Sequence, residues 1–250
     1  MIVDVWFYAL AVPAVLVAGI SKGGFGSGLV VLAVPLMSLA VPPPQAAAIM
    51  LPILVVMDLT AFWTYRKSFD RAQLKMILPA AAVGVGLGWA TFGLLDAAAV
   101  RLLVGVLALV FPLAYWLDWK PPRVVGPARL WGWLWGAVSG FTSFVAHAGG
   151  PPILVYMLPQ QLEKRLFVGT LIVFFMIVNA LKLVPYGQLG QFHPGNLLTS
   201  AVLLPLAPLG IWLGLWMQRR IPDCAFYGVC YAFLFLTGLK LVWDGVAGMV

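Results

Sequence analysis

The sequence predicts an all-helical integral membrane protein built from two inverted repeats. Each repeat is a re-entrant broken-helix hairpin followed by three transmembrane helices, giving about eight membrane segments in all. The composition, six apolar stretches of spanning length and two interrupted apolar stretches predict this class. Of the 250 residues, 63% are apolar and 9% are charged, and the mean hydropathy is +1.01. Soluble domains carry roughly 25% charged residues, so a soluble fold is excluded.

Charge and cysteine content exclude further classes. The net charge of +7 is spread over short loops, so no nucleic acid is expected as a partner. With only Cys224 and Cys230, the chain has no disulfide framework. Because these cysteines lack other potential ligands nearby, they are interpreted as packing residues, and neither a metal nor a cofactor is predicted. Residues 1–20 lack the basic start and cleavage pattern of a signal peptide, so they are interpreted as structural.

Six stretches are apolar over the roughly 20 residues that a spanning helix needs. They are 46–65, 74–95, 98–117, 164–185, 196–218 and 224–246. Aromatic residues near their ends are expected to form interfacial belts: Trp63, Tyr65, Trp89, Tyr115, Trp116, Trp119, Trp216 and Trp243.

Two further apolar regions, 5–41 and 130–159, are interrupted. The first breaks at the sequence Ser-Lys-Gly-Gly-Phe-Gly-Ser-Gly, residues 21–28, and the second at His-Ala-Gly-Gly-Pro-Pro, residues 147–152. In each, the limb after the break is short for a membrane span. Backbone groups freed at membrane depth require partners from protein or from a wet cavity. Both regions are therefore predicted to be hairpins.

Basic residues set the expected orientation, because cytoplasmic loops are enriched in Lys and Arg. The loop near 66–75 is placed in the cytoplasm, and Lys164 and Arg165 join it only if region 130–159 leaves by the face it entered. In that case 11 of the 15 basic residues are cytoplasmic: Arg66, Lys67, Arg71, Lys75, Lys120, Arg123, Arg129, Lys164, Arg165, Arg219 and Arg220. By analogy, region 5–41 is a hairpin entered from outside, and both termini lie outside the cytoplasm.

An internal echo supports a duplication. Pro79, Gly84, Gly88 and Asp118 recur 126 positions later as Pro205, Gly210, Gly214 and Asp244. The expected repeats are residues 1–120 and 121–250 of one compact membrane domain. An odd number of crossings in each repeat places the two in opposite orientation, as in many secondary transporters.

The two breaks form the predicted binding site. A helix that begins inside the membrane presents free N–H groups and a partial positive charge, which suits an anion. The predicted substrate-binding residues are Lys22, Gly23, Gly24, Gly26, Ser27, Gly28, His147, Gly149, Gly150, Pro151 and Asn179. The alternative is that the glycines only allow close helix packing.

Three charged residues leave alternatives open. A cation in the hydrocarbon region usually has a function, but Lys22 could instead snorkel to the headgroups. Asp58 could pair with Lys22, carry a coupling proton or join a polar network. Lys182 is expected to snorkel to the outer surface. His147 could bind an anion, or it could be a packing histidine.

Two segments resemble the sulfite exporter TauE/SafE family, also called DUF81. They are GISKGGFGSGLVVLAVPLMSLAVPPPQAAAIMLPIL, which carries the Gly-rich break and a Pro-bearing turn, and GFTSFVAHAGGPPILVYMLP in the second half. The chain departs from the family pattern at Ser27, where many members have a third glycine, and at Pro151 and Pro152. The resemblance implies a permease, not an enzyme, that exports sulfite or an organosulfonate across the inner membrane by alternating access. Because no GxxxxGK[ST] motif is present, coupling to the proton motive force is expected.

Other readings remain. The chain could be a permease for a cation or another anion, or an intramembrane hydrolase that pairs Ser143 with His147. Besides a small anion and membrane lipid, a second copy of the chain is a possible partner, through the Trp-rich helix that starts at Leu130.

Overall fold

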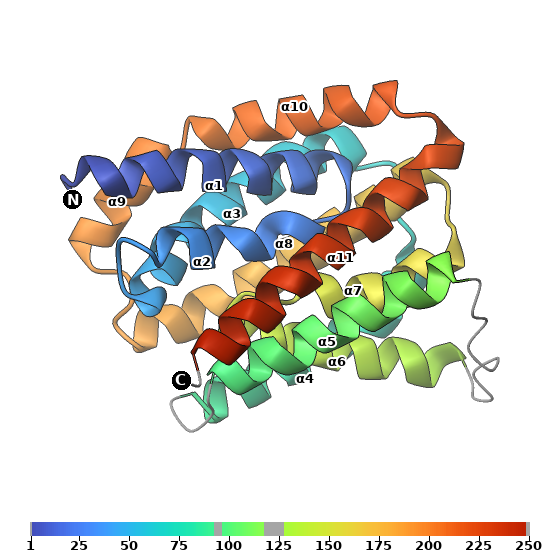
Figure 1. Ribbon diagram of the computed structural model, residues 1–250, viewed down its shortest axis with the longest axis horizontal. Coiled ribbons are helices and arrows are strands. Elements are labelled where there is room, and N and C mark those ends of the chain that lie inside the picture. Colours follow the sequence, from blue (N-terminus) through green and yellow to red (C-terminus); the bar gives the residue numbers. More distant parts are fainter. Residues whose placement is uncertain (1, 93–96, 118–127, 249–250) are drawn as a thin grey trace.

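Every regular element that the computed structural model describes is a helix; the described residues are 2–92, 97–117 and 128–248. The elements are α1 (Val5–Gly24), η1 (Gly28–Leu32), α2 (Ala33–Met37), α3 (Pro43–Tyr65), α4 (Arg71–Ala90), α5 (Ala97–Trp116), α6 (Ala128–Ala146), α7 (Gly150–Met157), η2 (Leu158–Gln160), α8 (Lys164–Gln188), α9 (Pro194–Leu203), α10 (Leu206–Arg220) and α11 (Asp223–Ala247) (Figure 1). Among the described residues, five helices are long and apolar enough to cross a membrane, and the bent pair α9–α10 makes a sixth. The chain is an integral membrane protein, as predicted.

The predicted spans correspond to α3, α4, α5, α8, α9–α10 and α11, with one difference. The span 196–218 is not one straight helix, because α9 and α10 meet at 41°. Pro205 and Pro208 lack the N–H groups that would continue the helix. The helix α5, Ala97–Trp116, covers almost all of the predicted span 98–117. The predictions for Asp118, Trp119, Lys120, Arg123 and the repeat boundary lie outside the described residues.

The segment before α3 returns to the end of the bundle at which it starts. Ile2 N donates to Thr199 Oγ1 at 3.1 Å, and Gln45 Nε2 donates to Asn196 Oδ1 at 3.1 Å. Residues 2 and 45 therefore both lie beside the beginning of α9. This is the geometry expected of the first hairpin.

The second interrupted segment also returns on itself. Near the beginning of α6, a Cβ on Gly132 would lie 2.3 Å from Met76 Cε. At the end of α7, Tyr156 Oη donates to Gln73 Oε1 at 2.7 Å. Gln73 and Met76 both belong to the first two turns of α4, so the two ends of this hairpin lie together.

The two return limbs differ in local structure. In the second, α7 begins at Gly150 with proline in its first turn, as predicted, because proline lacks only an N–H that is unpaired there. In the first, the limb begins as the 3-10 helix η1 and becomes α-helical only at Ala33. Pro35 cannot donate to the carbonyl of Val31, which disfavours α-helix in that turn. The first limb therefore begins with 3-10 turns, and the second begins as an α-helix.

Helix pairs follow a repeating pattern. α1 packs on α10 and α6 packs on α4, while α3 packs on α8 and α5 packs on α11. A two-fold axis that exchanges the two halves would map the pair α1–α10 onto the pair α6–α4. It would map the pairs α3–α8 and α5–α11 each onto itself. This pattern supports the predicted inverted repeats, which stay a prediction.

The basic residues that flank α3, α8 and α10 gather at one end of the bundle. Arg165 Nη2 donates to Thr64 O at 3.4 Å, and Lys164 Nζ donates to Ile221 O at 3.3 Å. Arg219 lines a pocket with Thr64 and Arg165. We call this the basic end, and it has the arrangement that the predicted cytoplasmic face requires.

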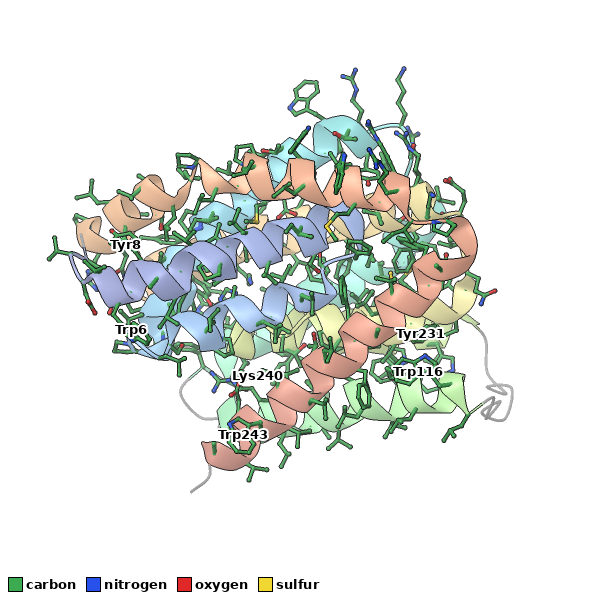
Figure 2. The ribbon with its side chains drawn as sticks, turned by 45° about the horizontal axis from the view of Figure 1, so that its top comes forward. Trp6, Tyr8, Trp116, Tyr231, Lys240 and Trp243 are labelled. Carbon is green, nitrogen blue, oxygen red and sulfur yellow. The ribbon has the colours of Figure 1, made fainter. Side chains whose placement is uncertain are left out.

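Most of the predicted aromatic belt is exposed on the surface of the bundle. Trp63, Trp89, Trp116, Trp216 and Trp243 are between 42% and 72% exposed, and Figure 2 shows Trp243 near the end of α11 and Trp6 near the beginning of α1. Tyr65, in contrast, is buried. Its assignment to the belt is wrong, because its hydroxyl has partners inside the bundle.

Candidate functional site

The two breaks meet at a small buried cavity. A Cβ on Gly150 would lie 2.8 Å from Ser27 O, so the second return limb begins against the first break. The cavity measures about 20 Å³ and is lined by Lys22, Ser27, Val30, Val31, Leu54, Ser143, His147, Gly149, Gly150, Phe175, Asn179 and Lys182. It therefore brings together both breaks, α3 and the middle of α8.

Each break is held by hydroxyl groups of the helix that precedes it. Leu29 N donates to Ser21 Oγ at 2.9 Å. At the second break, Ser139 Oγ donates to Gly149 O at 2.7 Å, and Thr142 Oγ1 lies 3.0 Å from Ala148 O. Backbone groups that would be costly inside a membrane are thus paired within the protein.

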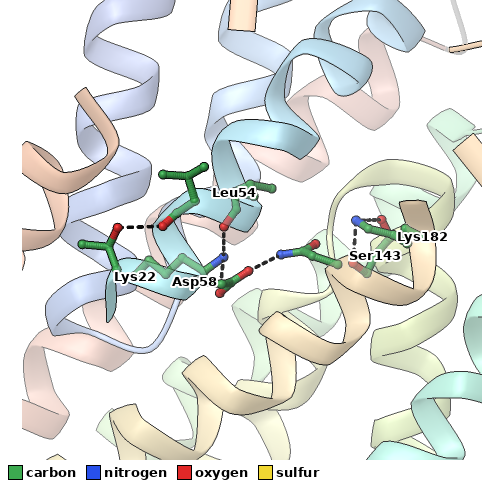
Figure 3. Close-up of polar contacts among 8 residues, drawn as sticks. Lys22, Leu54, Asp58, Ser143 and Lys182 are labelled. Atoms are coloured by element: carbon green, nitrogen blue, oxygen red, sulfur yellow. Dashed lines mark hydrogen bonds and ion pairs between the residues drawn. The ribbon is translucent and has the colours of Figure 1, made fainter. Parts of the chain in front are cut away.

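Lys22 and Asp58 form a buried ion pair. The Lys22 Nζ and Asp58 Oδ1 atoms are 2.7 Å apart, and neither side chain is more than 1% exposed. Lys22 Nζ also lies 3.4 Å from Leu54 O, and Asn179 Nδ2 donates to Asp58 Oδ2 at 2.8 Å (Figure 3). Of the alternatives for Asp58, the structure shows the pairing with Lys22. Snorkelling of Lys22 is wrong.

Lys182 is a second buried cation at the same cavity, which sequence reasoning missed. It is 1% exposed, and its Nζ donates to the carbonyl oxygen and to Oγ of Ser143, both at 3.2 Å (Figure 3). The expected snorkelling of Lys182 is therefore wrong. Its position three residues after Asn179 was the available signal, because residues i and i+3 share a helix face.

Two further polar groups face the cavity from the breaks. Ser27 adopts φ 71° and its buried Oγ has no hydrogen-bond partner among the described residues. His147, just after α6, has φ 51°, and its Nε2 lies 2.7 Å from Tyr186 Oη. The hydrolase reading assumed that Ser143 and His147 share a helical face. His147 lies beyond the end of α6 and its ring contacts Tyr186, so that premise is wrong.

Several predicted site residues do not line the cavity. Gly23 and Gly24 pack against α10, where added Cβ atoms would lie 2.5 Å from the carbonyl oxygens of Ile211 and Gly214. Gly26 has φ 76° and faces Leu171 and Phe167. Gly28 lies against Leu154, and Pro151 is buried in the first turn of α7. For Gly23 and Gly24, the packing alternative describes the structure.

A helical membrane bundle with a charged cavity where two broken helices meet has the architecture of a membrane transporter. The chain belongs to the sulfite exporter TauE/SafE family, whose model matches residues 11–241. The match includes both breaks and every residue that lines the cavity. The resemblance seen in the sequence is therefore confirmed, and the protein is a multi-pass membrane protein of a transporter family. No curated protein and no solved structure matches the chain.

Proposed function

We propose that this protein exports a small sulfur oxyanion, such as sulfite or an organosulfonate, across the bacterial inner membrane by alternating access of its two halves. The observation that carries the proposal is the convergence of Lys22 and Lys182 with both breaks on one buried cavity. Both termini and the beginning of α9 then face the periplasm, and the basic end faces the cytoplasm.

The cavity has the charge that an anion requires. Two lysines face it and a single carboxylate, Asp58, is paired with one of them. The contacts of Lys182 are to the neutral groups of Ser143. An oxyanion would accept charge-assisted hydrogen bonds from both ammonium groups and a further bond from the Ser27 hydroxyl. A cation permease is disfavoured, because a cation would meet two positive charges.

The size of the cavity requires a conformational change. About 20 Å³ is room for one water molecule, so we interpret this conformation as closed. Admitting sulfite requires the breaks to move apart, and their contact joins elements of the two halves, at Ser27 and Gly150. Relative motion of residues 1–120 and 121–250 would open the site to one side and then to the other.

Asp58 provides an internal counter-ion for the closed conformation. A lone ammonium group inside a membrane protein is costly, and Asp58 neutralises Lys22 when the cavity is closed. A bound oxyanion would replace Asp58 as the partner of Lys22, while the hydrogen bond from Asn179 to Asp58 is retained. The inside-negative potential drives a monoanion outward by about 2.3 kcal/mol per 100 mV, so the electrical part of the proton motive force suffices for export.

Flux measurements in proteoliposomes test the proposal. Sulfite, thiosulfate, sulfate, sulfoacetate, chloride and sodium would be followed with imposed pH gradients and membrane potentials. We expect saturable movement of sulfite or a sulfonate that Lys22→Ala abolishes and Lys240→Ala leaves unchanged, because Lys240 pairs with Asp244 away from the cavity. If folded protein moves none of these anions, or if Lys22→Ala transports normally, the proposal fails.

A further inference from the structure

A second pocket lies at the basic end, where the end of α3 meets the beginning of α8 and the end of α10. Its volume is about 210 Å³. Three cationic side chains line it together with the polar groups of two buried residues: Lys164, Arg165, Arg219, Tyr65 and Gln218. We call it the basic-end pocket. It is separate from the cavity at the breaks and shares none of its lining residues.

Positive charge predominates in the basic-end pocket. Arg165 Nη2 donates to the backbone carbonyl of Thr64, which carries no net charge. The neighbouring acid, Glu163, caps α8 by accepting from Arg165 N at 3.1 Å. Arg165 and Arg219 thus bring two guanidinium groups to the pocket, and guanidinium groups match the geometry of oxyanions well.

The side-chain amide of Gln218 is an independent observation that points to a ligand in this pocket. It is 4% exposed, and its buried Nε2 has no hydrogen-bond partner among the described residues. A buried donor without a partner is destabilising, and an oxyanion in the pocket would satisfy it. The polar wall and the cations therefore favour the same kind of ligand.

Tyr65 links this pocket to the central cavity. Its hydroxyl lies 2.8 Å from Gln218 Oε1 and 3.0 Å from Gly23 O. Gly23 directly follows Lys22, which pairs with Asp58. The Tyr65 side chain, 1% exposed, therefore stands between the two charged sites.

We propose that the basic-end pocket is a second anion site, at which a small oxyanion binds on the cytoplasmic face before it passes Tyr65 to the central cavity. The identity of the anion and the side of the membrane rest on the proposed function. A lipid phosphate offers similar chemistry, so the experiment must separate a free oxyanion from a headgroup.

Sulfite binding in nanodiscs tests the pocket without any transport. With Lys22→Met as the background, we expect saturable binding that Gln218→Leu and Arg219→Gln each weaken by about three- to tenfold, the range for a partly screened charge or a hydrogen bond. Arg220→Gln is the matched control, because Arg220 stacks over Trp216 and does not line the pocket. Nanodiscs of phosphatidylcholine alone are compared with nanodiscs that also contain phosphatidylglycerol.

Flux from the cytoplasmic side provides the second readout, with Lys22 intact. Gln218→Leu and Arg219→Gln should raise the half-saturating sulfite concentration by a similar factor, with the maximal rate kept within about twofold. Equal behaviour of Arg219→Gln and Arg220→Gln in both assays would overturn the proposal, as would binding that phosphatidylglycerol abolishes. If the variants transport sulfite normally, the pocket proposal fails and the proposed function stands. If the wild type moves no anion, the proposed function fails and the nanodisc assay alone decides the pocket.

Discussion

Two lysine side chains reach the central cavity from different helices, and their partners differ. Lys22 of α1 contacts a carboxylate, whereas Lys182 of α8 contacts the hydroxyl and carbonyl of Ser143. An incoming anion has to displace Asp58 from Lys22, but at Lys182 it competes only with neutral oxygens. We therefore expect the contact with Lys182 to cost the anion less than the contact with Lys22, which requires the Asp58 contact to be given up.

Replacing Lys182 with methionine tests whether this lysine contacts the anion. Lys182→Met keeps the length of the side chain and removes its charge, so the helix packing should persist. A hydrogen bond to a charged group contributes about 1.5–3 kcal/mol, and we expect the rate at subsaturating sulfite to fall at least about tenfold. Lys240 lies on α11, and Lys240→Met should leave this rate unchanged. Wild-type flux in folded Lys182→Met protein would remove Lys182 from the binding site.

Asp58→Asn separates loaded from unloaded transitions of the carrier. The amide is close in shape to the carboxylate but cannot neutralise Lys22 when no anion is bound. Exchange of labelled for unlabelled sulfite needs only the loaded carrier, so we expect it to persist. Net efflux requires the unloaded carrier to return, and should fall about tenfold or more, because an unpaired buried charge is costly. Equal loss of both activities would instead identify Asp58 as a structural residue.

Residue chemistry could be predicted only in part from the sequence. A lysine beside a glycine break and an aspartate inside a span are rare in membrane helices, which is why Lys22 and Asp58 could be paired. Lys182 lies near the end of a predicted span, where snorkelling is the usual outcome. Its burial depends on Ser143, 39 positions earlier in the chain, and such a contact has no local signal. Tyr65 was misplaced for the same reason.

At the scale of elements, glycine and proline located the breaks, but not every local conformation. The return limb α7 begins at Gly150, as its Gly-Gly-Pro-Pro sequence predicts. The 3-10 start of the first limb and the 41° bend between α9 and α10 were missed. Pro79 is the residue of α4 that corresponds to Pro205, and α4 continues through it without a break. Proline alone therefore does not determine a break.

The crossing of α4 and α6 offers a matched pair of glycines. A Cβ on Gly84 would lie 2.0 Å from Ala137 O, whereas a Cβ on Gly86 meets nothing within 4 Å. We expect Gly84→Ala to destabilise the protein by about 1–3 kcal/mol through overpacking, and Gly86→Ala to be neutral or to stabilise by up to about 1 kcal/mol. The melting temperature of each variant in detergent, measured by fluorescence-detection size-exclusion chromatography, tests both expectations. Similar melting temperatures for the two variants would contradict close packing at this crossing.

At the scale of the whole molecule, the arrangement of helix pairs joins each half of the chain to the other. The pairs α1–α10 and α6–α4 each join the broken hairpin of one half to a helix of the other. Such interlocked hairpins place both breaks at the centre, where the halves meet. The expectation of two repeats came from spacing and charge counts in the sequence, but the interlocking depends on contacts between distant segments and could not be read from either half alone.

Three single cysteines test the topology on which the assignment of sides rests. The variants are Lys67→Cys, Gln161→Cys and Gln188→Cys, each made in a background without Cys224 and Cys230. Positions 67 and 161 lie at the basic end, one before and one after the second hairpin in the chain, and position 188 follows the spanning part of α8. All three positions are exposed. If region 130–159 is re-entrant, a membrane-impermeant maleimide added to intact cells should label Gln188→Cys and spare the other two. If that region crosses the membrane, Lys67→Cys and Gln161→Cys must react oppositely. If the maleimide labels Gln161→Cys but not Lys67→Cys, the prediction of an inverted repeat is wrong. The assignment of the basic-end pocket to the cytoplasmic face then fails as well.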